Sequence, residues 1–324
     1  MYKLNLKDRK ILYELDLNCR QSNAQIGKKV GLSRDVVAYR INRMQKEGVI
    51  KNFWTAINTF KLGYQVFRIY INFHYVSNKI KREIIQYFTK YRNSWAVISV
   101  EGPIDLSLVI WVKNIYEFYR FWNKTLEKYG DYFEKYTISV YIQAVGYKKS
   151  YLLDKPDKSD NKIMYRTTCD GTIVKIDEID YKILNEIAVN ARIPLIELAE
   201  KIGCSSQSIS YRLRNLEKSG VIQAYRVNID RSFLGLQIYK VDIFLKDYNQ
   251  RGNIIRYLEN KGCIECLNVA VGWSDIEPEI VVENTDKLIK LMEEISDKFP
   301  NSIKKENYWI MATVHKERWL PDLY

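Results

Sequence analysis

The segment that decides the fold spans residues 10–50, KILYELDLNCRQSNAQIGKKVGLSRDVVAYRINRMQKEGVI, because the chain contains it twice. Shifted by 172 positions, it superposes without a gap on residues 182–222, KILNEIAVNARIPLIELAEKIGCSSQSISYRLRNLEKSGVI, and 15 of the 41 positions are identical. The match continues beyond the quoted segments, with small shifts that loop deletions explain. The 324-residue chain is therefore a tandem duplication.

Within the repeat, apolar spacing predicts three helices joined by short turns. A first helix ends near Cys19, and a second, over residues 23–30, ends at Gly31, a residue type that tolerates a left-handed helix end. Ser33 can cap a third helix, which carries one apolar stripe. The stripe is Val37, Ile41 and Met44 in the first copy and Ile209, Leu213 and Leu216 in the second. Each copy therefore predicts a helix-turn-helix.

The outward face of the third helix mixes basic, amide and small residues, which suits entry into the major groove of DNA. The candidate DNA-binding residues are Ser33, Arg34, Asp35, Ala38, Tyr39, Arg40, Asn42 and Arg43 in the first copy and Ser205, Ser206, Gln207, Ser210, Tyr211, Arg212, Arg214 and Asn215 in the second. Because these faces diverged while the apolar stripes did not, we predict an asymmetric DNA site. Arg40 and Arg212 recur at one helix position and are expected to contact phosphates.

After each helix-turn-helix, the pattern changes to strands alternating with helices. The order is β-α-β-β-α-β, which is the ferredoxin-like arrangement. In the first copy these elements are expected over residues 66–73, 79–91, 95–100, 106–112, 116–129 and 137–145, and the second copy runs from 238–245 to 308–314. The predicted fold class is α+β, with two tandem units that each join a winged helix-turn-helix to a ferredoxin-like domain.

A stretch rich in charge, Pro, Ser and Asn, from Asp154 to Lys162, separates the copies and is typical of a solvated linker. Such a linker is long enough for the two α/β domains of one chain to pack together as a pseudo-twofold unit. The expected boundaries are residues 1–58 and 175–230 for the helix-turn-helix domains, 62–152 and 234–321 for the ferredoxin-like sensor or dimerisation domains, and 153–174 for the linker.

This layout resembles the Lrp/AsnC family of feast/famine transcriptional regulators. The most specific marks are the Gly-Val-Ile exits at Gly48 and Gly220, the Leu-Gly pairs at Leu62 and Leu234, and one Gly-x-x-Asp turn in each copy. The resemblance implies that the helix-turn-helix binds promoter DNA, while the second domain drives dimerisation and often binds an amino acid. Family members typically carry one copy, so two copies imply a covalent pseudo-dimer, which can assemble further into homo-oligomers.

In that family the effector binds near the Gly-x-x-Asp turn and the last strand. The resemblance therefore points to Gly102, Asp105, Thr137, Ser139, Gly272 and Asp275 as candidate effector-binding residues. The second copy has Lys305 and Asn307 where the first keeps hydroxyl side chains, so effector binding is expected to be lost or altered in that half. The alternative role for the two aspartates is to cap backbone amides of the turn.

Composition narrows the remaining classes. Lys and Arg total 51 against 39 Asp and Glu, so the net charge of +12 suits a polyanionic partner such as double-stranded DNA. No apolar run reaches the length of a membrane span and the N-terminus lacks a signal-peptide core, so a cytoplasmic protein is expected.

Cys263 and Cys266 lack the second pair or nearby His that a zinc site needs. Neither His74 nor His315 recurs in the repeat, and phosphate-binding loops are missing, so neither a cofactor nor enzyme activity is expected.

Two alternative functions remain open. Siroheme decarboxylases are similar in layout to these regulators and bind a polyanionic tetrapyrrole with basic residues, which a basic chain also suits. An architectural DNA-binding protein without an effector would bind through phosphates, with little sequence preference.

Overall fold

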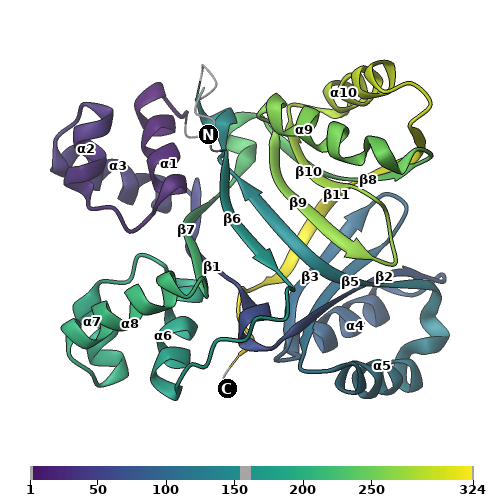
Figure 1. Cartoon of the computed structure of the whole chain (residues 1–324), viewed down its shortest axis with the longest axis horizontal. Helices are drawn as coiled ribbons and strands as arrows, with labels where there is room; N and C mark the ends of the chain where they lie inside the picture. Colours follow the sequence, from purple (N-terminus) through teal and green to yellow (C-terminus); the bar gives the residue numbers. More distant parts are fainter. Residues whose placement is uncertain (1–2, 154–161, 323–324) are drawn as a thin grey trace.

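The two repeats fold into a pair of helix-turn-helix domains and a pair of α/β domains (Figure 1). The computed structural model describes residues 3–153 and 162–322 of the chain. In Figure 1 the helical domains lie on the left and the α/β domains on the right. The architecture is the predicted α+β arrangement of two tandem units.

Each helical domain contains three helices with a tight turn before the third. The first domain has α1 (Leu6–Leu17), α2 (Asn23–Val30) and α3 (Arg34–Lys46), and the second has α6 (Glu178–Val189), α7 (Leu195–Ile202) and α8 (Ser206–Lys218). Gly31 and Gly203 end α2 and α7 with φ of 68° and 76°, a left-handed geometry that favours glycine. Ser33 and Ser205 then cap α3 and α8 by accepting backbone hydrogen bonds.

The two helical domains form one body around a shared ribbon and core. Strand β1 (Ile50–Ile57) pairs antiparallel with β7 (Ile222–Ile229), and apolar side chains from both copies make a single core. Arg20 donates a 2.8 Å hydrogen bond to the carbonyl of Ala191, and its repeat equivalent Arg192 donates a 3.0 Å bond to the carbonyl of Gln21. Arg20 and Arg192, here called the reciprocal arginine clamp, therefore hold the two domains in a pseudo-twofold pair.

The α/β domains have the predicted order of elements. The first contains β2 (Gln65–Phe73), α4 (Asn78–Lys90), β3 (Ser94–Glu101), β4 (Leu106–Val112), α5 (Ile115–Tyr129) and β5 (Phe133–Tyr147). The second contains β8 (Gln237–Leu245), α9 (Arg251–Lys261), β9 (Ile264–Val271), β10 (Glu277–Val282), α10 (Thr285–Lys298) and β11 (Ile303–Glu317). Each is a ferredoxin-like β-α-β-β-α-β unit.

The two α/β domains join edge to edge into a ring of strands. β3 pairs antiparallel with β11 and β5 with β9, so the order runs β2-β4-β3-β11-β8-β10-β9-β5. Because β2 also pairs with β5, this order closes on itself. Helices α4 and α5 cover one half of the ring and α9 and α10 cover the other (Figure 1). The α/β domains of one chain therefore pack together, which confirms the predicted pseudo-twofold unit.

Part of the expected linker is instead a strand. β6 (Ile163–Thr168) lies within residues 153–174 and pairs antiparallel with β5. Its Tyr165 is buried against Gly146, where a Cβ atom would lie only 1.9 Å from the tyrosine ring. Most of the charged stretch that suggested a linker, residues 154–161, lies outside the described residues.

The two faces of the ring differ in polarity. Along β2, Phe67, Ile69 and Ile71 pack outward beneath the helices, while Arg68 and Tyr70 point inward. Strand β8 repeats this alternation, with Lys240 on its inward face. The helix-facing surface is thus an ordinary apolar core, whereas the space inside the ring is lined by charged and polar side chains together with apolar and aromatic ones.

Candidate functional site

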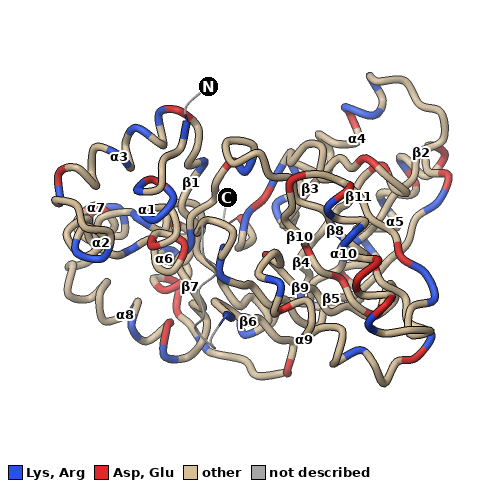
Figure 2. The backbone as a smooth tube through the Cα atoms, turned by 90° about the horizontal axis from the view of Figure 1, so that it is seen from above, with Lys and Arg blue, Asp and Glu red and all other residues tan. Residues whose placement is uncertain are grey.

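The outward faces of α3 and α8 form the candidate DNA-binding surface. Tyr39 and Tyr211, at equivalent positions, are 62% and 66% exposed. The exposed members of the predicted set are Ser33, Arg34, Asp35, Tyr39, Asn42, Arg43, Ser205, Gln207, Tyr211, Arg214 and Asn215, while Ala38, Arg40, Ser206, Ser210 and Arg212 are half-buried. Figure 2 shows α3 and α8 on opposite sides of the helical pair, each with basic residues along it.

Arg40 and Arg212 have partners within their own domains. Arg40 donates a 2.7 Å hydrogen bond to Asp8 of α1, and Arg212 donates 2.7 Å bonds to Asp177 and Asp180. The hydrogen bonds to Asp180 and Asp177 raise the pKa of Arg212. Arg40 thus connects α3 to the start of α1, and Arg212 connects α8 to the start of α6. The phosphate contacts that the sequence predicts for the two arginines would compete with these ion pairs.

The same pairing predicts unequal effects of removing the two arginines. We expect Arg40→Ala to lower the free energy of unfolding by about 1–3 kcal/mol, because Asp8 is only 1% exposed and loses a charged donor. Arg212→Ala should cost less than about 1 kcal/mol, because Asp177 and Asp180 remain in contact with water. Urea unfolding of the two variants measures the difference, and equal losses would contradict this account.

The two Gly-x-x-Asp turns lie where the α/β domains meet. Gly102 has a φ of 146°, and a Cβ atom there would lie 2.7 Å from the Cβ of Trp309 on β11. Gly272 has a φ of 95°, and a Cβ atom there would lie 3.0 Å from the carbonyl oxygen of Ile138 on β5. Each turn therefore packs against the last strand of the other repeat, and glycine permits the close contact.

The other candidate effector residues have local roles or lie buried near these turns. Asp105 accepts a 2.9 Å hydrogen bond from the backbone of Phe73, and Asp275 accepts a 2.7 Å bond from that of Leu245. Thr137 is half-buried on β5, and Ser139 is buried with a hydroxyl that has no partner in the described structure. None of the six candidate effector residues lines the cavity described next.

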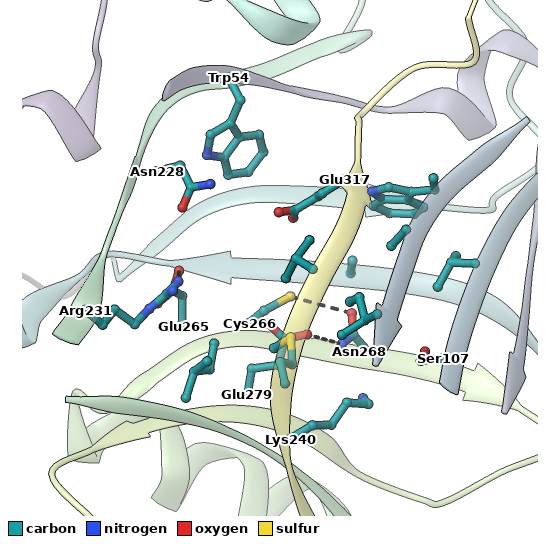
Figure 3. Close-up of a pocket in the computed structure, with 18 of the residues that line it drawn as sticks. Trp54, Ser107, Asn228, Arg231, Lys240, Glu265, Cys266, Asn268, Glu279 and Glu317 are labelled. Atoms are coloured by element: carbon teal, nitrogen blue, oxygen red, sulfur yellow. Dashed lines mark hydrogen bonds and ion pairs between the residues drawn. The ribbon is translucent and has the colours of Figure 1, made fainter. Parts of the chain in front are cut away.

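A cavity of about 910 Å³ occupies the interior of the strand ring. Its wall combines inward residues of the ring, among them Lys240 and Glu279, with Trp54 and Asn228 of the β1–β7 ribbon (Figure 3). The volume falls within the range of about 300–1,000 Å³ that is usual for small-molecule sites. The residue patterns described above do not predict this cavity.

A buried ion network crosses the cavity wall between the two repeats. Glu277 accepts hydrogen bonds from Arg68, at 2.9 Å for one of them, and from Lys240 at 2.8 Å. Arg68 and Lys240 are repeat equivalents, and all three side chains are almost fully buried. Burial alone would raise the pKa of the Glu277 carboxyl, but the two cations hold it at about 2. Glu277 therefore stays ionised and joins the two α/β domains.

A second ion network connects all four domains. Asp16 of α1 accepts hydrogen bonds from Arg226 of β7 at 2.7 Å and from the Lys149 ammonium, just after β5, at 3.0 Å. Lys149 also lies 3.1 Å from Glu265 of β9, which forms an ion pair with Arg231. The helix-turn-helix pair is thereby fixed to the α/β pair at this edge of the cavity.

The cysteines and acids of the described residues do not suggest a metal site. All five cysteines are free, and burial raises the pKa of the Cys263 thiol to about 11. Within the described part of the chain, His, Cys, Asp and Glu form no group of three or more that could hold a metal ion. The same residues include no helix long and apolar enough to span a membrane.

Comparison with known proteins bears on both the fold and the helical domains. A family model described as winged helix-turn-helix DNA-binding matches residues 4–51 and 176–223. An HTH-type transcriptional regulator of Pyrococcus abyssi is 34% identical over 116 residues, which cover 35% of this chain and 77% of the relative. The transcriptional regulator LrpB of Bacillus subtilis is 24% identical over 141 residues, which cover 44% of this chain and 90% of the relative. The fold and these matches define a class of winged helix-turn-helix proteins, and the chain belongs to the Lrp/AsnC family.

Other relatives match over a shorter part of their length. The proline dehydrogenase transcriptional activator of Rhodobacter capsulatus is 40% identical over 77 residues, which cover 24% of this chain and 50% of the relative. The chain spans about half or less of the length of the first curated relatives that it matches.

Two solved structures of one protein match the whole four-domain layout. The siroheme decarboxylase NirDL covers 99% of this chain and 95% of its own, with a TM-score of 0.65 and 13% sequence identity. At this identity the likeness concerns the fold alone. It shows that the arrangement of two helix-turn-helix domains and two α/β domains exists elsewhere.

Proposed function

We propose that this chain is a sequence-specific DNA-binding transcriptional regulator in which one chain supplies both recognition helices. The proposal rests mainly on one observation: the recognition helices α3 and α8 differ in their exposed residues and belong to the same rigid pair of domains. The β1–β7 ribbon, the shared core and the reciprocal arginine clamp hold α3 and α8 in a fixed relation. The net charge of +12 favours contact with the phosphate backbone.

The two recognition helices offer different groups to the DNA bases. At equivalent positions, Arg34 corresponds to Ser206 and Asp35 to Gln207, while the buried stripes of the helices remain apolar. A bidentate Arg favours guanine and a bidentate Gln favours adenine, each with about 1–3 kcal/mol of discrimination. A fused pair is not held to twofold symmetry, so its two half-sites can differ.

Selection from random DNA duplexes tests this proposal directly. We expect a motif with two unlike half-sites whose centres lie about 10–10.5 base pairs, or a multiple of that spacing, apart. A variant that copies the α3 face onto α8 should instead select a palindrome. Its substitutions are Ser206→Arg, Gln207→Asp, Ser208→Val, Ser210→Ala, Arg214→Asn and Asn215→Arg.

The control for this selection is the unmodified chain under the same salt conditions. A palindrome selected by the unmodified chain would contradict the asymmetric reading. Recovery of no motif, with binding governed by salt alone, would favour the architectural role instead.

Repeating the selection with pooled amino acids tests control by an effector, for which the residues around the two Gly-x-x-Asp turns are the proposed site.

A tetrapyrrole enzyme is the second candidate, favoured by the fold shared with a siroheme decarboxylase along the whole chain. A polyanionic ligand needs basic groups that are free to pair with it. The described wall of the cavity contains Glu265, Glu279 and Glu317 and no histidine, and its cations are already paired with carboxylates. The chemistry of the cavity therefore supports the regulator over the enzyme.

A further inference from the structure

The cavity inside the strand ring is asymmetric, although two copies of one repeat build it. At the shift of 172, Arg226 corresponds to Trp54, and at the shift of 170, Glu265 corresponds to Trp95. One side of the cavity therefore carries the ion network around Asp16, while the equivalent side presents tryptophan rings. The two sides are suited to different chemistry.

The cations in the described wall of this cavity already have carboxylate partners. Each lies within 4 Å of a carboxylate oxygen, which is the ordinary limit for an ion pair. The pairs are Arg68 and Lys240 with Glu277, Lys149 and Arg231 with Glu265, and Lys51 with Asp230. An anionic ligand would therefore have to displace an existing ion pair.

Two carboxylates of the wall lack a cation in the described structure. Glu279 accepts a 3.1 Å hydrogen bond from the amide of Asn268, and the side chain of Glu317, at the end of β11, makes no hydrogen bond or ion pair with a described residue. Burial raises the pKa of the Glu279 carboxyl, whereas Glu317 is exposed to solvent. Glu279 and Glu317 are therefore the wall carboxylates with which a bound cation could pair without displacing an existing ion pair.

Aromatic rings lie beside these carboxylates. Trp54 and Trp319 stack with ring centroids 4.4 Å apart, and Trp95 meets Trp319 edge-on at 4.8 Å. Figure 3 shows Trp54 and Glu317 facing the same hollow. Aromatic faces attract organic cations because the ring quadrupole is negative above and below its plane. Val314 lines the cavity yet is 49% exposed, so the cavity is open to solvent.

An unpartnered hydroxyl on the wall also indicates a ligand. Tyr70 is 2% exposed and lines the cavity, and its hydroxyl makes no hydrogen bond within the described structure. A buried hydroxyl without a partner is costly, because it has given up its hydrogen bonds to water. The oxygen of this hydroxyl can accept a hydrogen bond from the ammonium group of a bound molecule.

We propose that this cavity binds a small organic cation with a planar aromatic body. Its ammonium group pairs with Glu317 and Glu279, and its ring packs on the wall formed by Trp54, Trp95 and Trp319. This ligand site goes beyond the proposed DNA-binding function and does not depend on it, because the binding is measured without DNA.

Calorimetric titration with tryptamine and indole-3-acetate tests the proposal, because the two probes share a ring and differ in charge. We expect tryptamine to bind with a Kd below about 1 mM and at least about tenfold more tightly than indole-3-acetate. Glu317→Gln should weaken tryptamine binding at least about tenfold, because it removes a charge-assisted hydrogen bond. The same variant should bind indole-3-acetate no more weakly than the unmodified chain does.

Glu306→Gln is the matched control, because Glu306 lies on the same strand but outside the cavity wall. It should leave tryptamine affinity unchanged, and thermal unfolding of both variants confirms that they are folded. Equal affinity for the two probes, no tryptamine binding at about 1 mM, or an unaffected Glu317→Gln variant overturns the inference. These outcomes are separate from the DNA selection, so failure of one proposal is distinguishable from failure of the other.

Discussion

Replacing Asp16 by Asn is expected to lower the free energy of unfolding by about 3–5 kcal/mol, because it removes one side of a buried ion network. Asp16 is fully buried and accepts hydrogen bonds from Arg226 and Lys149, whose side chains are 1% and 3% exposed. The amide keeps the shape of the carboxylate but leaves these buried cations without its charge. Urea unfolding measures the loss, provided that the dependence on denaturant is unchanged.

A double replacement separates the charge from the packing at this position. Asp16→Leu combined with Arg226→Met removes the carboxylate together with its main partner, and Lys149 keeps its contact with Glu265. Replacing an ion pair by apolar side chains of similar size is often close to neutral. The double variant should therefore be more stable than Asp16→Asn. The opposite order of stabilities would mean that the hydrogen bonds, and not the unpaired charges, dominate.

Glu277→Gln should lower the free energy of unfolding by a similar amount, about 3–5 kcal/mol at neutral pH, because Arg68 and Lys240 both depend on this carboxylate. The effect should depend on pH in a defined direction. The folded pKa of about 2 lies below the ordinary value of 4.5, so the ionised Glu277 contributes its stability above about pH 4.5. That contribution is lost as the pH falls from about 4.5 towards 2.

Unfolding curves recorded from pH 7 down to pH 3 test this dependence. The difference in stability between the unmodified chain and Glu277→Gln should shrink as the pH falls. Glu293→Gln, on the exposed side of α10, is the control and should change stability little at any pH. A difference that stays constant across this range would show that Glu277 is not held ionised by its two neighbours.

Local patterns made much of the fold predictable. The helices of the two helical domains follow from apolar spacing and from caps a few residues away, such as Gly31 and Ser33. The predicted ranges for β4 and α2 agree with the structure, and the order of the α/β elements is confirmed. The resemblance implies a family whose members dimerise. Two copies in one chain are therefore predicted to pair with each other, as two separate subunits would.

Features that depend on remote partners were harder to predict. β6 is a short strand whose pairing with β5 is not visible in its own sequence, so its sequence predicts a linker. The ion pairs of Arg40 and Arg212 join residues from two different helices, and helical spacing alone places both arginines on an outward face.

The cavity did leave a signal in the sequence. Arg68 lies within the apolar strand β2, Lys240 within β8, and Ser107 within β4, each at an alternate position. Alternation places such residues on one face of a sheet, away from the helices. Polar residues on that face of both repeats indicate that the face is not an ordinary apolar core, but only the closure of the ring shows that the interior is a single cavity.

The reciprocal arginine clamp affects how the amount of DNA-competent protein depends on the number of chains in the cell. A regulator assembled from separate subunits loses its DNA-competent form on dilution, because its dimers dissociate. Here Arg20 and Arg192 belong to one chain, and the local concentration of each half around the other is set by chain geometry and not by expression level. In the proposed regulator, promoter occupancy at low copy number therefore rises linearly with the number of chains, without an assembly threshold.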